Sequence, residues 1–199
     1  QRAAGLGHWV VENAKPARSF LKRVDALVPL EQPLQSLHIV ELPKPTKGSA
    51  QQAVDWGALL APALQGHDIG LLSDAGMPAL ADPGAMLVAQ AHRLGIRVEP
   101  LPGPSSITLA AAASGLNGQS FAFVGYVPNQ EPARSQALRA LESHSRLHQQ
   151  TQVAIETPYR NEALMMALLK ALQPSTLLSV SSGLTLPGAW MMTRSVAQW

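Results

Sequence analysis

Three charged residues stand where a side chain could exchange a proton with a bound ligand: Glu12, Lys15 and Glu156. Glu156 ends the strand expected at 152–156, and a carboxylate at the end of a parallel strand points to the ligand-binding edge of an open α/β sheet. A carboxylate there can act as a general base. Glu156 also stands four residues before Arg160, so a structural ion pair is an equally open interpretation.

Two glycine-containing loops could hold a ligand through the main chain. They are Ser73 to Leu80 and Pro102 to Ser106. Gly76 and Gly103 have no Cβ, so a ligand can approach the backbone there. The amides of Ser105 and Ser106 are expected in the first turn of a helix, where unpaired amides at the positive end suit a carboxylate or a hydroxyl-rich ribose. Both loops could equally be ordinary connectors.

The elements around these loops predict a parallel sheet. The apolar run 68–73 reads as a strand. Asp82 followed by Pro83 predicts the start of a helix, with Asp82 as its cap, and Gly95 ends that helix. The run 96–101 predicts a second strand, followed by a helix from Pro104 to near Gly115. Two successive strand-to-helix turns place both loops on one edge of the sheet.

The rest of the chain continues the alternation of strands and helices, which predicts an α/β fold. A polar break at 117–120 suggests two domains, 1–117 and 118–199. Further strands are expected at 8–12, 37–42, 121–126, 152–156, 176–182 and 190–193, the last as a hairpin strand, and further helices at 15–24, 50–64, 131–147 and 160–172.

Composition narrows the class of protein. The 199 residues are 46% hydrophobic and 14% charged, as in a compact globular protein, and there is no cysteine for a disulfide or a thiolate metal site. No apolar run is long enough to span a bilayer and no leader is visible, so we expect a cytoplasmic protein. Lys and Arg balance Asp and Glu nine to nine over 1–117 and six to four over 118–199, which is not the dense basic face of a tight nucleic-acid binder.

Three other kinds of site lack support. His144 and His148 stand four apart, but without a third ligand they do not predict a metal site. The G-x-S-x-G pattern of a hydrolase and the G-x-G-x-x-G pattern of a dinucleotide site are both absent.

Four segments resemble those of a known family. They are SDAGMPALADPG (73–84), LPGPSS (101–106), FAFVGYVP (121–128) and IETPYR (155–160). Together they resemble the tetrapyrrole (corrin/porphyrin) methylase superfamily, and are most similar to the branch that contains ribosomal RNA small subunit methyltransferase I. The resemblance implies two α/β domains with S-adenosylmethionine in the cleft between them. It also implies that the opening strand and the final strands of the family pattern lie outside this sequence.

The resemblance also assigns cofactor contacts. Met77 replaces the acid of the family's Gly-Asp-Pro loop, which implies binding chiefly through the backbone, and Leu80 is implied to contact the adenosyl group. The positions that match the family's cofactor site are Ser73, Asp74, Ala75, Gly76, Met77, Leu80, Gly103, Ser105, Ser106, Glu156, Thr157 and Thr185.

The segments on the acceptor side depart from the ribosomal branch. They are 12–15 and 43–48, and the second carries Lys44 and Lys47, which could also belong to a plain surface loop. Acceptor recognition rests on side chains, so we expect the acceptor, or its mode of binding, to differ from that of the branch. An RNA ribose, a tetrapyrrole-like small molecule and a non-catalytic role in binding S-adenosylmethionine stay open. A homodimer is expected, because relatives commonly pair and the chain is rich in apolar residues.

Overall fold

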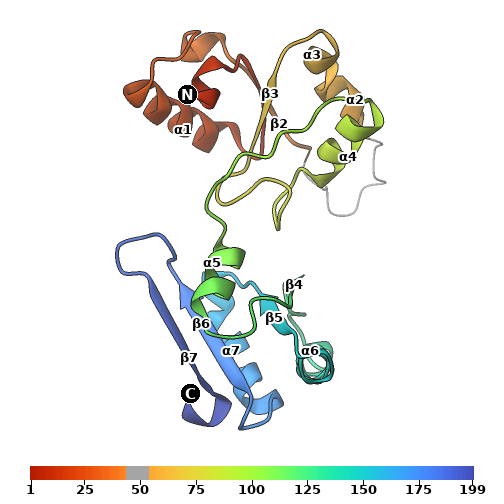
Figure 1. Cartoon of the computed structure of the whole chain (residues 1–199), viewed down its shortest axis with the longest axis vertical. Helices are drawn as coiled ribbons and strands as arrows, with labels where there is room; N and C mark the ends of the chain where they lie inside the picture. Colours follow the sequence, from red (N-terminus) through yellow and green to blue (C-terminus); the bar gives the residue numbers. More distant parts are fainter. Residues whose placement is uncertain (44–53) are drawn as a thin grey trace. The chain divides into compact units, whose positions relative to one another are not determined.

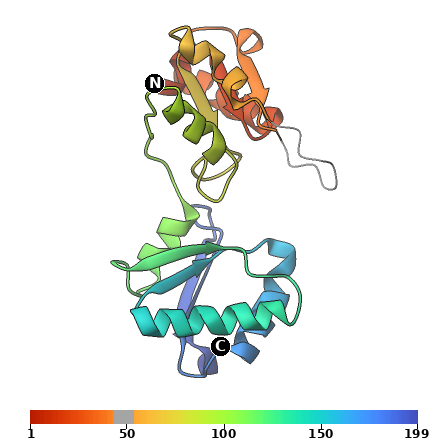
Figure 2. The ribbon, with the colours of Figure 1, turned by 90° about the vertical axis from the view of Figure 1, so that its right-hand side faces the viewer.

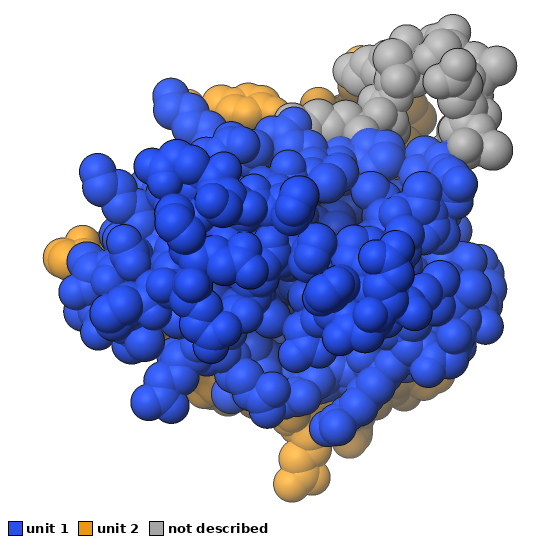
Figure 3. Space-filling view, turned by 90° about the horizontal axis from the view of Figure 1, so that it is seen from above, with its two compact units in different colours: residues 1–104 blue, residues 105–199 orange. Residues whose placement is uncertain are grey.

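The computed structural model describes residues 1–43 and 54–199, so Lys44, Lys47 and most of segment 43–48 lie outside the described residues. The chain divides into two compact units, Gln1–Pro104 and Ser105–Trp199, which Figure 3 colours separately. The division falls before the expected boundary at 117, because the intervening helix is tied to the second unit. Thr193 Oγ1 donates to the carbonyl of Ser114 at 2.7 Å, and Thr151 Oγ1 to that of Asn117 at 2.9 Å.

A three-stranded parallel sheet forms the centre of the first unit (Figure 1). Its order is β2-β1-β3, and the strands are β1 (His8–Val11), β2 (His38–Glu41) and β3 (Ile69–Leu72). These match the strands expected at 8–12, 37–42 and 68–73. Trp9, Val10 and Val11 of the central strand are buried, as expected for a strand covered on both faces.

Helices cover both faces of this sheet. On one face, Ala17 and Leu21 of α1 (Ala14–Leu27) join a buried cluster with Trp9 and Val11. On the other, Val10 packs with Leu60 and with residues of α4 (Ala85–Arg93). The shorter helical elements are η1 (Arg2–Gly5), η2 (Leu34–Ser36), α2 (Trp56–Leu59) and α3 (Ala61–Leu64).

The helix expected over 50–64 was wrong as a single element. Residues 50–53 lie outside the described residues, and the remainder forms α2 and α3 with an interruption at Leu60. Pro62 explains the interruption, because proline has no N–H to continue the hydrogen-bond ladder from one helix into the next.

The strand expected over 96–101 was also wrong. None of these residues belongs to a strand, although Ile96 and Val98 still pack against the buried cluster around Val10. Pro100 and Pro102 remove backbone donors that a sheet ladder needs. Glu99 forms an ion pair with Arg2, with 2.9 Å between the charged atoms. The loop 102–106 therefore does not follow a sheet strand.

The second unit contains two separate strand pairs rather than one mixed sheet. β4 (Phe121–Gly125) and β5 (Thr151–Ala154) are parallel, whereas β6 (Leu177–Ser182) and β7 (Trp190–Ser195) form the expected antiparallel hairpin. Figure 2 shows α6 (Ala133–His148) lying along the β4–β5 pair. The remaining elements are α5 (Ser106–Ala113), α6 (Ala133–His148), η3 (Pro158–Arg160), α7 (Asn161–Ala171) and η4 (Val196–Gln198).

The core of the second unit lies where α6 meets α7. Leu138 of α6 packs with Ala167 and Ala171 of α7 and with Val127. In the described ranges of the chain, no helix is long and apolar enough to cross a membrane.

Candidate functional site

The carboxyl ends of β1 and β3 are joined by polar contacts. The amide of Glu12 donates to the carbonyl of Leu72 at 3.0 Å, and the Glu12 carboxylate accepts from the amide of Asp74 at 3.0 Å. Asn13 Nδ2 in turn donates to Asp74 Oδ2 at 2.6 Å. Glu12 and Asp74, both predicted site residues, therefore lie together although 62 positions separate them.

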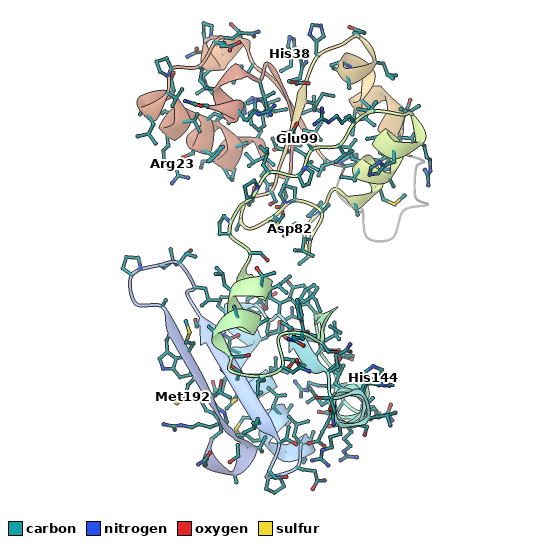
Figure 4. The ribbon with its side chains drawn as sticks, in the orientation of Figure 1. Arg23, His38, Asp82, Glu99, His144 and Met192 are labelled. Carbon is teal, nitrogen blue, oxygen red and sulfur yellow. The ribbon has the colours of Figure 1, made fainter. Side chains whose placement is uncertain are left out.

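Asp82 completes this group and is the residue that sequence reasoning missed. Burial raises the pKa of its carboxyl, and the charges of Glu12 and Asp74 raise it further, while a hydrogen bond from Ser73 opposes the shift. Figure 4 labels Asp82 in the loop between β3 and α4. The carboxylates of Glu12, Asp74 and Asp82 therefore lie near enough to one another at this edge for their charges to interact. We name Glu12, Asp74 and Asp82 the acidic edge.

Asp82 was expected to cap the following helix, and that expectation was wrong. The N-cap of α4 is Gly84, whose φ of 131° few other residues adopt. The chain turns back before the helix, with the amide of Ala79 donating to the carbonyl of Pro83 at 3.2 Å. The Asp82 carboxylate consequently faces Gly76, where an added Cβ would stand 3.9 Å from its Oδ2. An Asp-Pro pair predicts a cap from local spacing, and only the fold of the loop shows otherwise.

The loop that carries the acidic edge is strained and open. Gly76 has a φ of 74°, and Ala79 and Ala81 hold φ values of 64° and 65°, which cost a residue with a Cβ about 1–2 kcal/mol each. Such strain is a feature of ligand-binding loops. The other predicted contacts differ in exposure: Ser73 is buried, Met77 is half-buried, and Asp74, Ala75, Gly76 and Leu80 are exposed.

Lys15 lies beside this edge in the first turn of α1. Its side chain is exposed, and it takes part in none of the ion pairs found in the described ranges. Glu41, at the end of β2, accepts from the amide of Ala14 at 2.6 Å. A carboxylate from a neighbouring strand thus satisfies a free amide at the start of α1, as a cap would.

Gly103 has neither a conformational nor a packing reason to be glycine. Its φ is not positive, and within the described part of the chain a Cβ added to it would meet no atom within 4 Å. Ser105 is buried as the N-cap of α5, and its carbonyl accepts from the amide of Leu109 at 3.0 Å. Ser106 begins the helix and is exposed. The start of a helix, expected at Ser105 and Ser106, is therefore present.

In the second unit, Glu156 is engaged with its neighbours. Its Oε1 lies 2.9 Å from Arg160 Nε and accepts from the amide of Thr157 at 2.8 Å. The Glu156 side chain is 9% exposed. Thr185 lies in the turn between β6 and β7, exposed and with a φ of 73°. The structural ion pair between Glu156 and Arg160 is therefore formed, while the catalytic role of Glu156 stays a prediction.

The described residues contain no group of three or more His, Cys, Asp or Glu side chains arranged to hold a metal ion. His144 and His148 contact each other along α6, with ring centroids 4.3 Å apart.

An α/β unit with ligand-accessible loops at the carboxyl ends of its parallel strands defines a broad class of small-molecule-binding enzymes. Within that class, residues 12–194 match the family model of the Tetrapyrrole (Corrin/Porphyrin) Methylases. The match covers most of the chain, which therefore belongs to this family.

Individual relatives agree with the family. The chain is 42% identical over 97 residues to ribosomal RNA small subunit methyltransferase I of Vibrio cholerae, covering 49% of this chain and 32% of that protein. It is 32% identical over 155 residues to the protein of the same name from Pseudomonas aeruginosa, covering 75% of this chain and 54% of that protein. The chain thus spans between a third and about half of the length of these relatives.

Solved structures share the fold. The methyltransferase CobJ superimposes with a TM-score of 0.54 at 15% identity, covering 98% of this chain and 88% of that one. The cobalt precorrin-4 methyltransferase CbiF gives a TM-score of 0.55 at 16% identity, covering 97% and 76%. The mixed helix and sheet fold expected from sequence is therefore that of the tetrapyrrole methylases.

Proposed function

We propose that this chain is the donor-binding and catalytic part of an S-adenosylmethionine-dependent methyltransferase that modifies a ribose hydroxyl of RNA. The observation that carries the proposal is the acidic edge beside the exposed, strained loop 73–82. Support for an RNA acceptor comes from the relatives, which are named ribosomal RNA small subunit methyltransferases.

The residues at this edge suit the donor. When bound, S-adenosylmethionine supplies a methyl group carried on a positively charged sulfur. In the part of the chain that the structure describes, no Lys or Arg forms an ion pair with Glu12, Asp74 or Asp82. No Lys or Arg of the described residues therefore neutralises their charge, which can offset the positive charge of the donor. Each carboxylate already accepts a hydrogen bond from a neighbour, and its remaining lone pairs can accept from ribose hydroxyls. The exposed main chain at Ala75 and Gly76 leaves room for close approach.

Asp82 is the group we assign to proton transfer. A ribose hydroxyl must lose its proton as the oxygen attacks the methyl group, and a positioned base accelerates that loss. A carboxyl whose pKa is raised is a stronger base than an ordinary aspartate, which suits this role. Glu12 orients the loop through the amide of Asp74, and Lys15 is a candidate to hold the acceptor.

Further parts of the proposal follow from the family resemblance. The donor is held in a cleft to which both units contribute, and Gly103, Ser105, Ser106, Glu156, Thr157 and Thr185 take part. A ribosomal acceptor implies a cytoplasmic location. The protein is a homodimer, so light scattering at micromolar concentration should give about twice the chain mass of 21.1 kDa. A mass near that of one chain would contradict the dimer.

The test is release of S-adenosylhomocysteine from the donor in the presence of ribosomal small subunits that lack the ribose methyl mark. We expect turnover that ribonuclease treatment of the subunits abolishes. Turnover that survives ribonuclease would instead indicate a small-molecule acceptor. Donor binding without turnover on any fraction would indicate a non-catalytic binder.

Mapping the modified nucleotide tests the acceptor itself. Segments 12–15 and 43–48 depart from the ribosomal branch, so we expect the mark at a different nucleotide or with a different dependence on subunit assembly. Stoichiometric methylation at the cytidine of the ribosomal branch, with the same dependence on assembly, would contradict this expectation.

A further inference from the structure

The two tyrosines of the chain lie at one edge of the β4–β5 strand pair. Tyr126 directly follows β4, and Tyr159 lies in η3, just beyond β5. The strands β4 and β5 are parallel, so both tyrosines are at the carboxyl edge of the pair. Both are exposed, Tyr126 by 53% and Tyr159 by 83%. Both tyrosine side chains therefore lie on the surface of the second unit and not in its core.

A single guanidinium group joins the two rings. The Cζ of Arg160 lies 5.8 Å from the centroid of Tyr126 and 5.5 Å from that of Tyr159. Both distances are within the range in which a cation is attracted to an aromatic face. We name Tyr126, Tyr159 and Arg160 the tyrosine platform.

Two neighbouring polar side chains fix the Arg160 side chain of the platform. Arg160 Nε lies 2.9 Å from Glu156 Oε1 and donates to Thr157 Oγ1 at 3.0 Å. The Glu156 carboxylate is nearly buried, so the ion pair is well protected from solvent. Within residues 1–43 and 54–199, the terminal nitrogens of Arg160 donate to no protein group. The guanidinium plane is therefore positioned while its outer edge stays available to a ligand.

The chemistry of this surface favours a flat aromatic ligand over a phosphate. Glu156 offsets the charge of Arg160, so the platform carries no net charge to attract an anion. Aromatic faces and an arginine plane stack with nucleobases, and unpaired bases of RNA are available for such stacking. The modest charge of the second unit, six basic against four acidic residues, agrees with binding that does not depend chiefly on phosphate contacts.

We propose that the tyrosine platform stacks an unpaired nucleobase of the RNA acceptor. This inference rests on the proposed function only in taking RNA as the acceptor. It adds a substrate-binding surface and predicts that the enzyme recognises single-stranded segments.

The presence of only two tyrosines makes a direct test possible. The protein is labelled with carbon-13 in its tyrosine rings, and the ring signals are followed by NMR during titration with a mixed-sequence single-stranded oligoribonucleotide of about ten nucleotides. Both ring signals should shift, and the same sequence as a blunt duplex should shift them far less, because its bases are already paired and stacked. Ring signals that do not move at saturating single strand would overturn the proposal.

Variants measure the strength of stacking. By fluorescence anisotropy with the labelled single strand, Tyr126→Ala and Tyr159→Ala should each weaken binding about 5- to 100-fold. Tyr126→Phe and Tyr159→Phe keep the aromatic faces and should stay within about twofold of wild type. Arg139→Gln, an exposed charge on α6, is the matched control for general attraction to phosphate. Alanine variants that bind no more weakly than Arg139→Gln would overturn the proposal, and thermal unfolding confirms that each variant is folded.

A donor titration separates this inference from the proposed function. If S-adenosylmethionine alone shifts both ring signals and the alanine variants bind RNA normally, the rings hold the donor's adenine, which overturns the platform but not the methyltransferase. If the RNA results are as expected and no methyl transfer occurs on any RNA, the platform stands and the proposed activity fails.

Discussion

The two units place acidic side chains at the same kind of position but surround them differently. In the first unit, Glu12 and Asp74 follow parallel strands, and the loop 73–82 adds Asp82. In the second, Glu156 follows the parallel strand β5. Arg160 neutralises Glu156 at 2.9 Å, whereas the described residues supply no ion pair to any member of the acidic edge.

This difference teaches that the neighbours of a strand-end carboxylate, and not its topological position, decide its role. Burial raises the pKa of Asp82, and the like charges of Glu12 and Asp74 raise it further, so Asp82 holds its proton more tightly than an ordinary aspartate. Such an edge suits a cationic ligand and proton transfer. Glu156 instead positions the guanidinium group of Arg160, which contacts the rings of Tyr126 and Tyr159. Under the proposed function, the first unit carries the proton transfer, and the second unit adds donor contacts and the tyrosine platform.

The largest effect should come from Asp82→Asn. The amide keeps the size of the side chain but cannot accept the acceptor's proton, so kcat should fall about 100-fold or more. Donor affinity should change far less, because Glu12 and Asp74 remain. Turnover is measured as release of S-adenosylhomocysteine, and donor affinity by calorimetric titration.

Glu162→Gln is the matched control for Asp82→Asn, because Glu162 is an exposed acid of the second unit in the first turn of α7. Its kcat should stay near wild type. An unchanged kcat for Asp82→Asn would show that Asp82 takes no part in proton transfer. The first unit would then lose the catalytic role that distinguishes it from the second.

Glu156→Ala tests the other side of the comparison. Removing the nearly buried carboxylate leaves Arg160 without its partner, which should lower the free energy of unfolding by about 2 kcal/mol. Urea denaturation measures this change. A variant of unchanged stability and unchanged donor affinity that has lost turnover would show that Glu156 takes part in the chemistry.

Gly103→Val should weaken donor binding about tenfold or more, because a branched side chain would occupy space that the structure leaves open. Gly118→Val is a matched control, since in the described residues a Cβ at Gly118 also meets nothing within 4 Å and its φ is not positive. Calorimetric titration with S-adenosylmethionine compares the two. Equal affinities in two folded variants would remove Gly103 from the donor site.

Local patterns in the sequence were enough to predict most elements. The apolar run before Ser73 predicted β3, because short buried parallel strands are continuous apolar runs, and the alternation of strands with helices predicted β4 at 121–126. Gly95, with a φ of 70°, ends α4 as expected. Elements that depend on long-range pairing were less predictable. The run 96–101 has the apolar character of a strand, yet the prolines at 100 and 102 remove backbone donors that a sheet ladder needs, and the run stays outside the sheet.

The candidate site was predictable from the sequence only where its residues directly follow predicted strands. Glu12 and the glycine loop 73–80 follow strands, so their common edge could be foreseen. Asp82 could not, because its role depends on how the strained loop turns it away from the helix that follows. The meeting of Tyr126 with Arg160 likewise depends on the parallel pairing of β4 with β5. Neither contact leaves a local signal in the sequence.

The smallest effect is on stability as a function of pH. The pKa of Asp82 is raised in the folded chain, chiefly by burial, so the folded state holds more protons than the unfolded state between the two pKa values. The free energy of unfolding therefore falls as pH rises through that interval. Asp82→Asn removes this loss, so the inactive variant should be more stable than wild type at neutral pH, and the difference should vanish well below the ordinary aspartate value of about 3.8.

Glu131→Gln in the second unit should show the opposite sign. A hydrogen bond with Ser135 holds the pKa of Glu131 below its ordinary value, so its contribution to stability is present at neutral pH and is lost as the pH falls through the lowered pKa. Glu131→Gln should thus be less stable than wild type at neutral pH and should approach it in acid. Thermal unfolding of both variants across pH 3 to 8 gives the two curves. If Asp82→Asn also loses stability at neutral pH, the acidic edge is a stabilising network like the contacts of Glu131, and the electrostatic contrast between the two units disappears.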